Sequence, residues 1–339
     1  MVSDRSTSGG VAHARCGYGC DVTQPDDRPT ALALRALHLG DLLVAVPALR
    51  SLRRAHPEHH LVLATTPALA PLVDRIGGID TLLPTADPSA VPWRGREPDV
   101  VVNLHGTGPQ SHRALDALGS QRRIGFRCPT AEPGWEGPEW ADVVAAHPHE
   151  RARWCALLEA VGLPTDPDDL SLAAPARHPA EEPAVVHPGA RYGAKRWPVE
   201  RFAEVAAALE RPDRPVVVTG SPDERALALA VGDAAGLPRE RVLAGRTDLG
   251  ELCDLVAEAR LVISGDTGIA HLASAYATPS VVLFGPVDPA QWGPPAGGPH
   301  VALARPADRR GAPFADDPDP ALLAIGVDDV LTAAASVQR

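Results

Sequence analysis

The feature that most constrains the fold is a regular alternation of short apolar runs with segments of helical periodicity. Such an alternation favours a parallel sheet with helices on both faces, because consecutive parallel strands need a crossover between them. The predicted strands are 30–37, 60–64, 99–104, 184–187, 215–219, 260–264 and 280–284. The predicted helices are 67–76, 111–118, 199–209, 223–235, 249–258, 268–276 and one that begins at Leu42 and kinks slightly at Pro47. The predicted fold class is α/β, with two doubly wound, Rossmann-like domains.

A proline-rich, acidic stretch interrupts this alternation and divides the chain into two domains. We predict a disordered leader at 1–28, an N-terminal domain at 29–165, a linker at 166–183, a C-terminal domain at 184–305 and a tail at 306–339 that ends in a helix. Ligands of such sheets bind beyond the carboxyl ends of the strands. The candidate site is therefore expected in a cleft between the two domains.

The charge balance excludes one broad class of partner. The formal net charge is −11 and the isoelectric point is about 5.6, which argues against a wide basic surface that would hold nucleic acid. No apolar run reaches the roughly 18 residues that would span a bilayer, and no secretory signal pattern is visible, so a cytoplasmic protein is expected. Arg50, Arg53 and Arg54 on one predicted helix are either a peripheral contact with the inner face of the membrane or a solvated helix end.

Neither the cysteines nor the acidic residues indicate a metal site. The five cysteines are odd in number and scattered, so they do not form a disulfide framework. Cys16 and Cys20 lie near His13, yet no second ligand pair accompanies them, and reduced thiols in the leader are the favoured interpretation. No Asp-x-Asp pair that would hold Mg²⁺ on a diphosphate lies beside the candidate site. We therefore predict no metal.

The first pattern that carries chemistry is Gly40-Asp41, where the first predicted strand gives way to a helix. Two interpretations of Asp41 remain open. It could cap the helix that starts at Leu42. Alternatively, a carboxylate on this turn projects into the cleft and accepts a proton.

The second pattern is the loop from His187 to Pro198, in which small residues and three basic residues separate a strand from a helix. Small residues let backbone amides approach an anion, and Lys195 adds a point charge. Lys195 is the only lysine among 32 basic residues, which suggests that this position requires an ammonium rather than a guanidinium. The competing interpretations are a basic surface loop and the chance survival of one lysine.

The third pattern is the run from Ser264 to Leu272, in which a buried strand enters Gly-Asp-Thr-Gly and then a helix. The free amides of the helix start and the Thr267 hydroxyl would together bind an anion. Asp266 suits hydrogen bonds from sugar hydroxyls, or it caps the helix. His271 lies one turn into the helix and is either part of the site or a structural histidine.

Together with Leu283-Phe284-Gly285-Pro286-Val287-Asp288-Pro289, these patterns resemble glycosyltransferase family 9, the bacterial ADP-heptose:lipopolysaccharide heptosyltransferases and their relatives. The resemblance covers roughly residues 30–295, in the family's order. It implies a GT-B fold, an N-terminal acceptor domain, a C-terminal nucleotide-sugar domain, and an inverting, metal-independent transfer of a sugar. The implied partners are a nucleoside-diphosphate sugar, ADP-linked and with heptose as one candidate, and a glycan or glycolipid acceptor. No cofactor is implied.

Carried onto this sequence, the resemblance assigns roles to individual residues. Asp41 would be the catalytic base, and Lys195 would hold the donor diphosphate and the charge that develops on the leaving nucleotide. The other donor-side residues would be Gly189, Arg191, Glu224 on the ribose, Asp266 toward the sugar, Thr267, Gly268, Ile269 and His271. Gly40 and His105 would lie on the acceptor side. The alternatives are a non-catalytic nucleotide-sugar-binding protein and a GT-B-like nucleotide-sugar epimerase.

Overall fold

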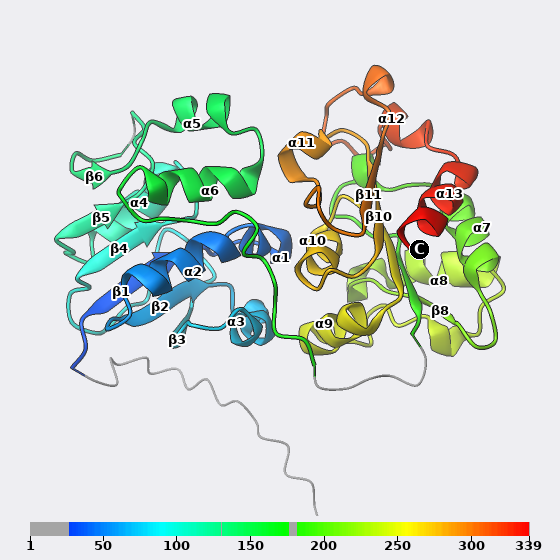
Figure 1. Ribbon diagram of the computed structural model, residues 1–339, viewed down its shortest axis with the longest axis horizontal. Coiled ribbons are helices and arrows are strands. Elements are labelled where there is room, and N and C mark those ends of the chain that lie inside the picture. Colours follow the sequence, from blue (N-terminus) through cyan, green and yellow to red (C-terminus); the bar gives the residue numbers. More distant parts are fainter. Residues whose placement is uncertain (1–26, 130, 176–181, 339) are drawn as a thin grey trace, which may run out of the picture.

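The computed structural model describes residues 27–129, 131–175 and 182–338, which form two lobes, each built on a parallel sheet (Figure 1). The N-terminal lobe has a six-stranded sheet in the order β3-β2-β1-β4-β5-β6, and the C-terminal lobe has a five-stranded sheet in the order β11-β10-β9-β7-β8. Helices cover the sheets, so the predicted α/β class with two doubly wound units is confirmed. No helix in the described ranges is long and apolar enough to cross a lipid bilayer.

The N-terminal lobe centres on β1, whose five residues are all buried. A strand covered on both faces needs an unbroken apolar sequence, and TALAL supplies one. The strands are β1 (Thr30–Leu34), β2 (His60–Thr65), β3 (Thr81–Pro84), β4 (Val100–Asn103), β5 (Arg122–Ile124) and β6 (Trp135–Glu136). The helices are α1 (Leu39–Leu43), α2 (Val46–Ala55), α3 (Ala70–Ile76), α4 (Pro109–Asp116), α5 (Trp140–Ala146) and α6 (Glu150–Glu159).

The C-terminal lobe repeats this arrangement around β9, which is also buried along its length. Its strands are β7 (Ala184–His187), β8 (Val216–Val218), β9 (Leu261–Gly265), β10 (Ser280–Phe284) and β11 (His300–Ala304). Its helices are α7 (Val199–Leu209), α8 (Arg225–Ala234), α9 (Leu249–Glu258), α10 (Gly268–Ala275), α11 (Pro289–Trp292), α12 (Pro320–Leu323) and α13 (Val327–Val337). The last of these helices, α13, lies within the predicted tail.

The segment after β1 differs from the sequence prediction. The strand ends at Leu34 rather than at residue 37, and α1 begins at Leu39, three residues before the predicted start at Leu42. Pro47 does not kink one long helix. The helix ends after Leu43 and α2 starts at Val46, so the proline occupies the first turn of a new helix, where its missing amide hydrogen costs nothing.

The two lobes pack against each other through α1 and α10, which face each other at the centre of Figure 1, and through α3 and α9. Two glycines permit the close approach of α1 to α10. A Cβ atom on Gly268 would lie 3.0 Å from the Leu39 side chain, and one on Gly40 would lie 2.9 Å from the Cδ2 atom of His271. A single apolar cluster continues through this contact and joins Leu42 to Ile269.

The predicted linker is held by both lobes where it is described. The Leu172 amide donates to the Ala275 carbonyl at 3.0 Å, and Asp169 pairs with both Arg50 and Arg54 at 2.6 Å. Arg53 pairs with Asp80 at 2.9 Å. The three arginines suggested for membrane contact thus have carboxylate partners within the protein. Nearly all of the predicted leader, with Cys16, Cys20 and His13, lies outside the described residues.

Candidate active site

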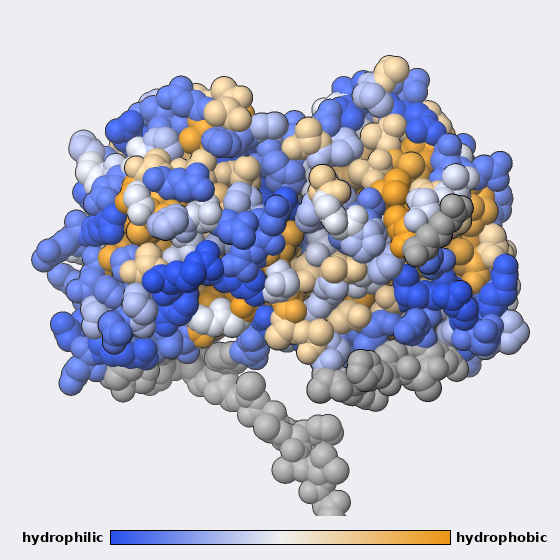
Figure 2. All heavy atoms as spheres, viewed as in Figure 1, coloured by the Kyte–Doolittle hydropathy of each residue, from blue (hydrophilic) through white to orange (hydrophobic). Residues whose placement is uncertain are grey.

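A pocket of about 780 Å³ opens between the lobes, where β7 and β9 end and where α1 and α10 begin. It lies where ligands of open α/β sheets bind. Every predicted site residue lines this pocket except His105. The lining residues are His38, Leu39, Gly40, Asp41, His187, Gly189, Ala190, Arg191, Tyr192, Lys195, Arg196, Ser221, Asp223, Glu224, Leu252, Asp266, Thr267, Gly268, Ile269, His271, Trp292 and Phe314. In the space-filling view the outline of the molecule is notched between the two lobes (Figure 2).

Asp41 lies in the first turn of α1 and faces the pocket from the N-terminal lobe. One of its carboxylate oxygens, Oδ2, accepts a hydrogen bond from the His38 amide at 3.1 Å. The side chain is 26% exposed, so a molecule in the pocket can reach it. The capping interpretation is therefore partly right, because the carboxylate does stabilise the helix start, but it does so from the third helical position.

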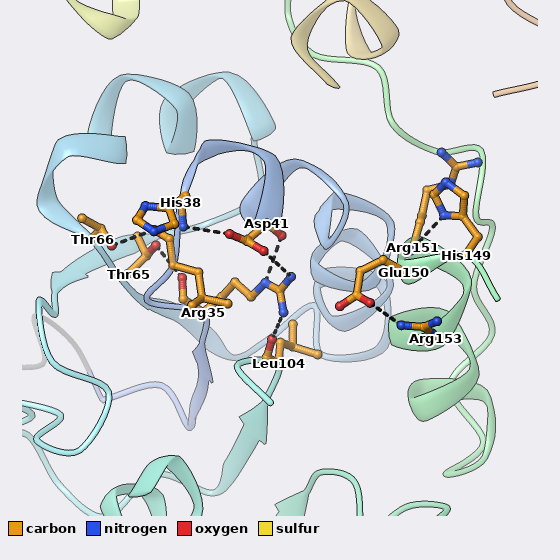
Figure 3. A network of polar contacts seen from close by, with 11 residues as sticks. Arg35, His38, Asp41, Thr65, Thr66, Leu104, His149, Glu150, Arg151 and Arg153 are labelled. Atoms are coloured by element: carbon orange, nitrogen blue, oxygen red, sulfur yellow. Dashed lines mark hydrogen bonds and ion pairs between the residues drawn. The ribbon is translucent and has the colours of Figure 1, made fainter. Parts of the chain in front are cut away.

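Arg35 lies behind Asp41, and the sequence analysis missed it (Figure 3). Its side chain is 1% exposed. Its Nε donates to the main-chain carbonyl of Asp41 at 2.9 Å, and its Nη1 donates to the carbonyl of Leu104. Its Nη2 lies 3.9 Å from the Oδ1 atom of Asp41. The signal was present in the sequence, since Arg35 is the one charged residue in the run from Thr30 to Leu37.

His105 stands on the loop after β4, beside Arg35 and Asp41 rather than in the wall of the pocket. Burial and the charge of Arg35 lower the pKa of His105 to about 4, against a smaller opposing effect of Asp41. Its buried Nδ1 atom has no hydrogen-bond partner. The ring is therefore neutral at pH 7.

His271 projects from α10 toward the N-terminal lobe, against Gly40. Trp292 packs edge-on against its ring with the two centroids 5.7 Å apart. Burial lowers the pKa of His271 to about 4, with a smaller opposing effect of the charge of Asp266. His271 is thus a neutral group where the lobes meet, and it both lines the pocket and packs in the interface.

Lys195 and Asp266 form an ion pair in the wall of the pocket that the C-terminal lobe supplies, with Nζ 2.7 Å from Oδ2. Asp266 is 6% exposed and Lys195 is 23% exposed. A buried carboxylate needs a partner of opposite charge, and Lys195 supplies it. From the sequence, Lys195 was predicted to bind a diphosphate and Asp266 to face a sugar, whereas the structure places the two side chains in direct contact.

The start of α10 lies beside this ion pair. Thr267 is the N-cap residue, and its hydroxyl is buried without a hydrogen-bond partner and makes no cap hydrogen bond. The first amides of a helix have no partner within the helix, so Gly268 and Ile269 present donors to the pocket that they line. The arrangement can bind an anion such as a phosphate.

Glu224 approaches the loop after β7 from the opposite wall. Its Oε2 accepts from the Ser221 amide at 2.8 Å, and its carboxylate lies so close to Gly189 that a Cβ there would be 2.3 Å from it. Behind it the Nδ1 atom of His187 lies 3.0 Å from the Thr219 hydroxyl, and burial lowers the pKa of His187. Gly189 thus makes room for an acidic side chain at this wall.

Comparison with known proteins then identifies the family. The model of glycosyltransferase family 9 (heptosyltransferase) matches residues 96–304, more than half of the chain. The chain belongs to glycosyltransferase family 9. Lipooligosaccharide heptosyltransferase 2 of Haemophilus influenzae is 37% identical over 114 residues, which are 32% of each protein. Lipopolysaccharide core heptosyltransferase OpsX of the same species is 24% identical over 288 residues, 77% of this chain and 80% of OpsX.

The architecture of this family 9 chain also matches solved structures. Escherichia coli ADP-heptose lps heptosyltransferase II aligns with a TM-score of 0.75 at 20% identity, over 91% of this chain and 98% of the other. This likeness confirms the predicted GT-B arrangement of two parallel sheets. The first relative above is matched over about a third of its own length.

Several residues that line this family 9 pocket were not named as site residues from the sequence, among them His38, Tyr192, Trp292 and Phe314. His38 contacts the guanidinium of Arg191 across the pocket. Tyr192 and Phe314 meet edge to face with centroids 5.0 Å apart, and Phe314 is 72% exposed. Among residues 27–129, 131–175 and 182–338 no three His, Cys, Asp or Glu side chains are grouped as metal ligands would be.

Proposed function

We propose that this protein transfers a sugar from a nucleoside diphosphate to an acceptor hydroxyl, with inversion at the anomeric carbon. One observation carries the proposal. A single pocket brings the Asp41 carboxylate of the N-terminal lobe together with the Lys195 ammonium and the start of α10 in the C-terminal lobe. The attacking hydroxyl needs a base and the departing diphosphate needs positive charge, and the two lobes supply one each.

The reaction uses these groups in one displacement. The acceptor oxygen forms a bond to the anomeric carbon, and its proton passes to the carboxylate of Asp41. The bond from that carbon to the phosphate oxygen breaks on the opposite face, so the configuration inverts. The electron pair leaves with the diphosphate, whose added charge is stabilised by Lys195 and by the amides of Gly268 and Ile269.

The Lys195–Asp266 ion pair prepares the donor side. Unpaired, the buried carboxylate of Asp266 would repel a phosphate at the start of α10. Lys195 neutralises this repulsion and is itself held at the site, which lowers the cost of ordering a flexible side chain when the donor binds. The other carboxylate oxygen of Asp266, Oδ1, then faces the donor sugar, and Glu224 accepts from the ribose. This division makes 184–305 the donor domain and 29–165 the acceptor domain.

The names of the relatives support one choice of substrates. These proteins are heptosyltransferases of lipopolysaccharide or lipooligosaccharide, and one of them is named for ADP-heptose. We therefore propose an ADP-linked heptose as the donor and a glycan or glycolipid of the cell envelope as the acceptor. Transfer would need no metal, because Lys195 and the helix amides provide the positive charge.

Two measurements test this function. Thermal melts with ADP-, GDP- and UDP-sugars should show a rise in melting temperature for the true donor, by the linkage between ligand binding and stability. Asp41→Asn should then lower kcat by about 100-fold or more while the donor Kd stays near that of the native protein. Asparagine can still accept from the His38 amide, so the helix start survives. Retained activity in Asp41→Asn would mean that Asp41 only caps the helix. Saturable donor binding without turnover by the native protein would mean that the protein binds nucleotide sugars and does not transfer them.

A further inference from the structure

Arg35 is a cation in a place where the fold could have used an apolar side chain. Its guanidinium packs over the Trp154 ring, 4.4 Å from the ring centroid, in the apolar layer beneath α1. Burial of a charge is expensive, and buried ion pairs are often no more stabilising than well-packed apolar residues of similar volume. The position is therefore poorly explained by stability alone.

Two of the polar contacts of Arg35 are with Asp41 itself. Nε holds the Asp41 carbonyl, Nη1 holds the Leu104 carbonyl, and Nη2 has no hydrogen-bond partner and points toward Asp41 Oδ1. The Asp41 carboxylate is thus restrained from two sides, since Oδ2 accepts from the His38 amide. Asp41 also lines the pocket, where an acceptor hydroxyl would lie.

The other titratable groups near the Asp41 carboxylate cannot hold it by opposite charge. His105 and His271 also face Asp41, and burial lowers the pKa of each to about 4, so both rings are neutral at pH 7. The negative charge of Glu150 on α6 attracts Arg35, but Glu150 is itself paired with Arg153 at 2.8 Å. Among the described residues whose charges act on Asp41, Arg35 is the cation that also touches its main chain.

We propose that Arg35 is a positioning residue for the reaction, which fixes the main chain and the carboxylate of Asp41 in the orientation that accepts the proton of the acceptor. The inference rests on the proposed function, because it presumes that Asp41 is the base. Arg35 touches neither substrate nor the reacting atoms. Its effect on turnover must therefore pass through Asp41 and must disappear when the carboxylate is absent.

A double-mutant cycle measures this dependence. Arg35→Met removes the charge and Arg35→Lys keeps it, and each is combined with Asp41→Asn. We expect Arg35→Met to lower kcat by about 10- to 100-fold with the donor KM changed by less than about threefold, and to cause less than about threefold further loss in the Asp41→Asn background. Arg35→Lys should recover part of kcat, because an ammonium can reach Oδ1 but cannot bind both carbonyls.

Arg260→Met is the matched control. Arg260 is also a largely buried arginine, and its Nη2 donates to the carbonyls of Leu209 and Arg214, away from the pocket. Its loss should lower the melting temperature and leave kcat within about twofold.

The outcomes distinguish an error in the role of Arg35 from an error in the role of Asp41. If the losses from Arg35→Met and Asp41→Asn multiply, Arg35 acts only on the fold and the inference is wrong. If Asp41→Asn alone leaves kcat unchanged, the proposed base is wrong instead. Should Arg35→Met not fold, the cycle with Arg35→Lys decides, because a loss of kcat from Arg35→Lys that is equally large with and without Asp41→Asn contradicts the inference.

Discussion

Gly40→Ala tests whether a glycine at the start of α1 is required by the contact between the lobes. In an isolated helix this change would be favourable by about 1 kcal/mol, because alanine loses less conformational entropy than glycine. Here the new methyl carbon would lie 2.9 Å from the Cδ2 atom of His271 and 3.6 Å from the Cα atom of Gly268. Trp292 backs the His271 ring, so the ring cannot simply turn away.

The chain supplies its own control. Gly250 is the second residue of α9 in the sequence Leu249-Gly250-Glu251, just as Gly40 is the second residue of α1 in Leu39-Gly40-Asp41. At Gly250 the nearest atoms to a new Cβ are Asp248 Oδ1, the end of a side chain, at 3.2 Å and Pro71 Cβ at 3.6 Å. The intrinsic gain is the same at both positions, so the difference between the variants isolates the contact with His271.

We expect overpacking at Gly40 to cost roughly 1–3 kcal/mol relative to Gly250→Ala. Thermal melts of both variants should therefore show Gly250→Ala at or above the native midpoint and Gly40→Ala below it. Transfer activity should fall for Gly40→Ala as well, because the methyl group displaces a pocket residue and the start of α1. Equal midpoints for the two variants would refute the reasoning, since they would show that a methyl group fits between α1 and α10 without strain.

Three further predictions concern charge. Lys195→Arg should lower kcat, because a planar guanidinium cannot occupy the place of the ammonium against Asp266, and equal rates would mean that the lone lysine has no special role. Transfer should persist in EDTA, and a strict requirement for a divalent cation would contradict the assignment of charge to Lys195 and α10. His271, with its folded pKa near 4, stays neutral as pH falls below 6.5, whereas the unfolded ring takes up a proton. The free energy of unfolding that comes from keeping His271 neutral is therefore complete above pH 6.5 and decreases as the pH falls toward 4. At pH 5 up to about 2 kcal/mol of it is lost. Melts at pH 7.5 and pH 5 should show a smaller difference for His271→Gln than for the native protein.

Much of the fold could be predicted from periodicity, and the exceptions have physical reasons. The bounds of β7, α7, α9 and β10 match the sequence prediction, because each is an apolar or amphipathic run between clear turn residues. The short strands β3, β5, β6 and β11 were missed. β5 reads Arg-Arg-Ile and β6 has two residues, so neither carries the apolar pattern of a buried strand. Their pairing depends on the neighbouring strands in the sheet rather than on their own sequence.

The helices α5 and α6 were missed for a related reason. The sequence of α6, ERARWCALLE, lacks a clear separation of charged and apolar faces, since Arg151 and Arg153 are themselves largely buried beside Trp154 and Cys155. Three helices pack against it, namely α2, α5 and α11. A helix buried from several sides loses the amphipathic signal by which sequence analysis finds it.

In the candidate site, too, some features could be predicted from the sequence and others could not. The glycines, Asp41, Lys195 and Thr267 could be found because each has a local reason for its place, at the end of a strand or the start of a helix. What could not be found was which of these groups meet. Lys195 reaches Asp266 only because β7 and β9 are neighbours in the sheet, and Gly40 meets His271 only because the lobes dock. The polar partners at this site are therefore set by sheet order and lobe packing. A substitution at such a contact should be judged by its partner across the sheet or interface before its sequence neighbours are considered.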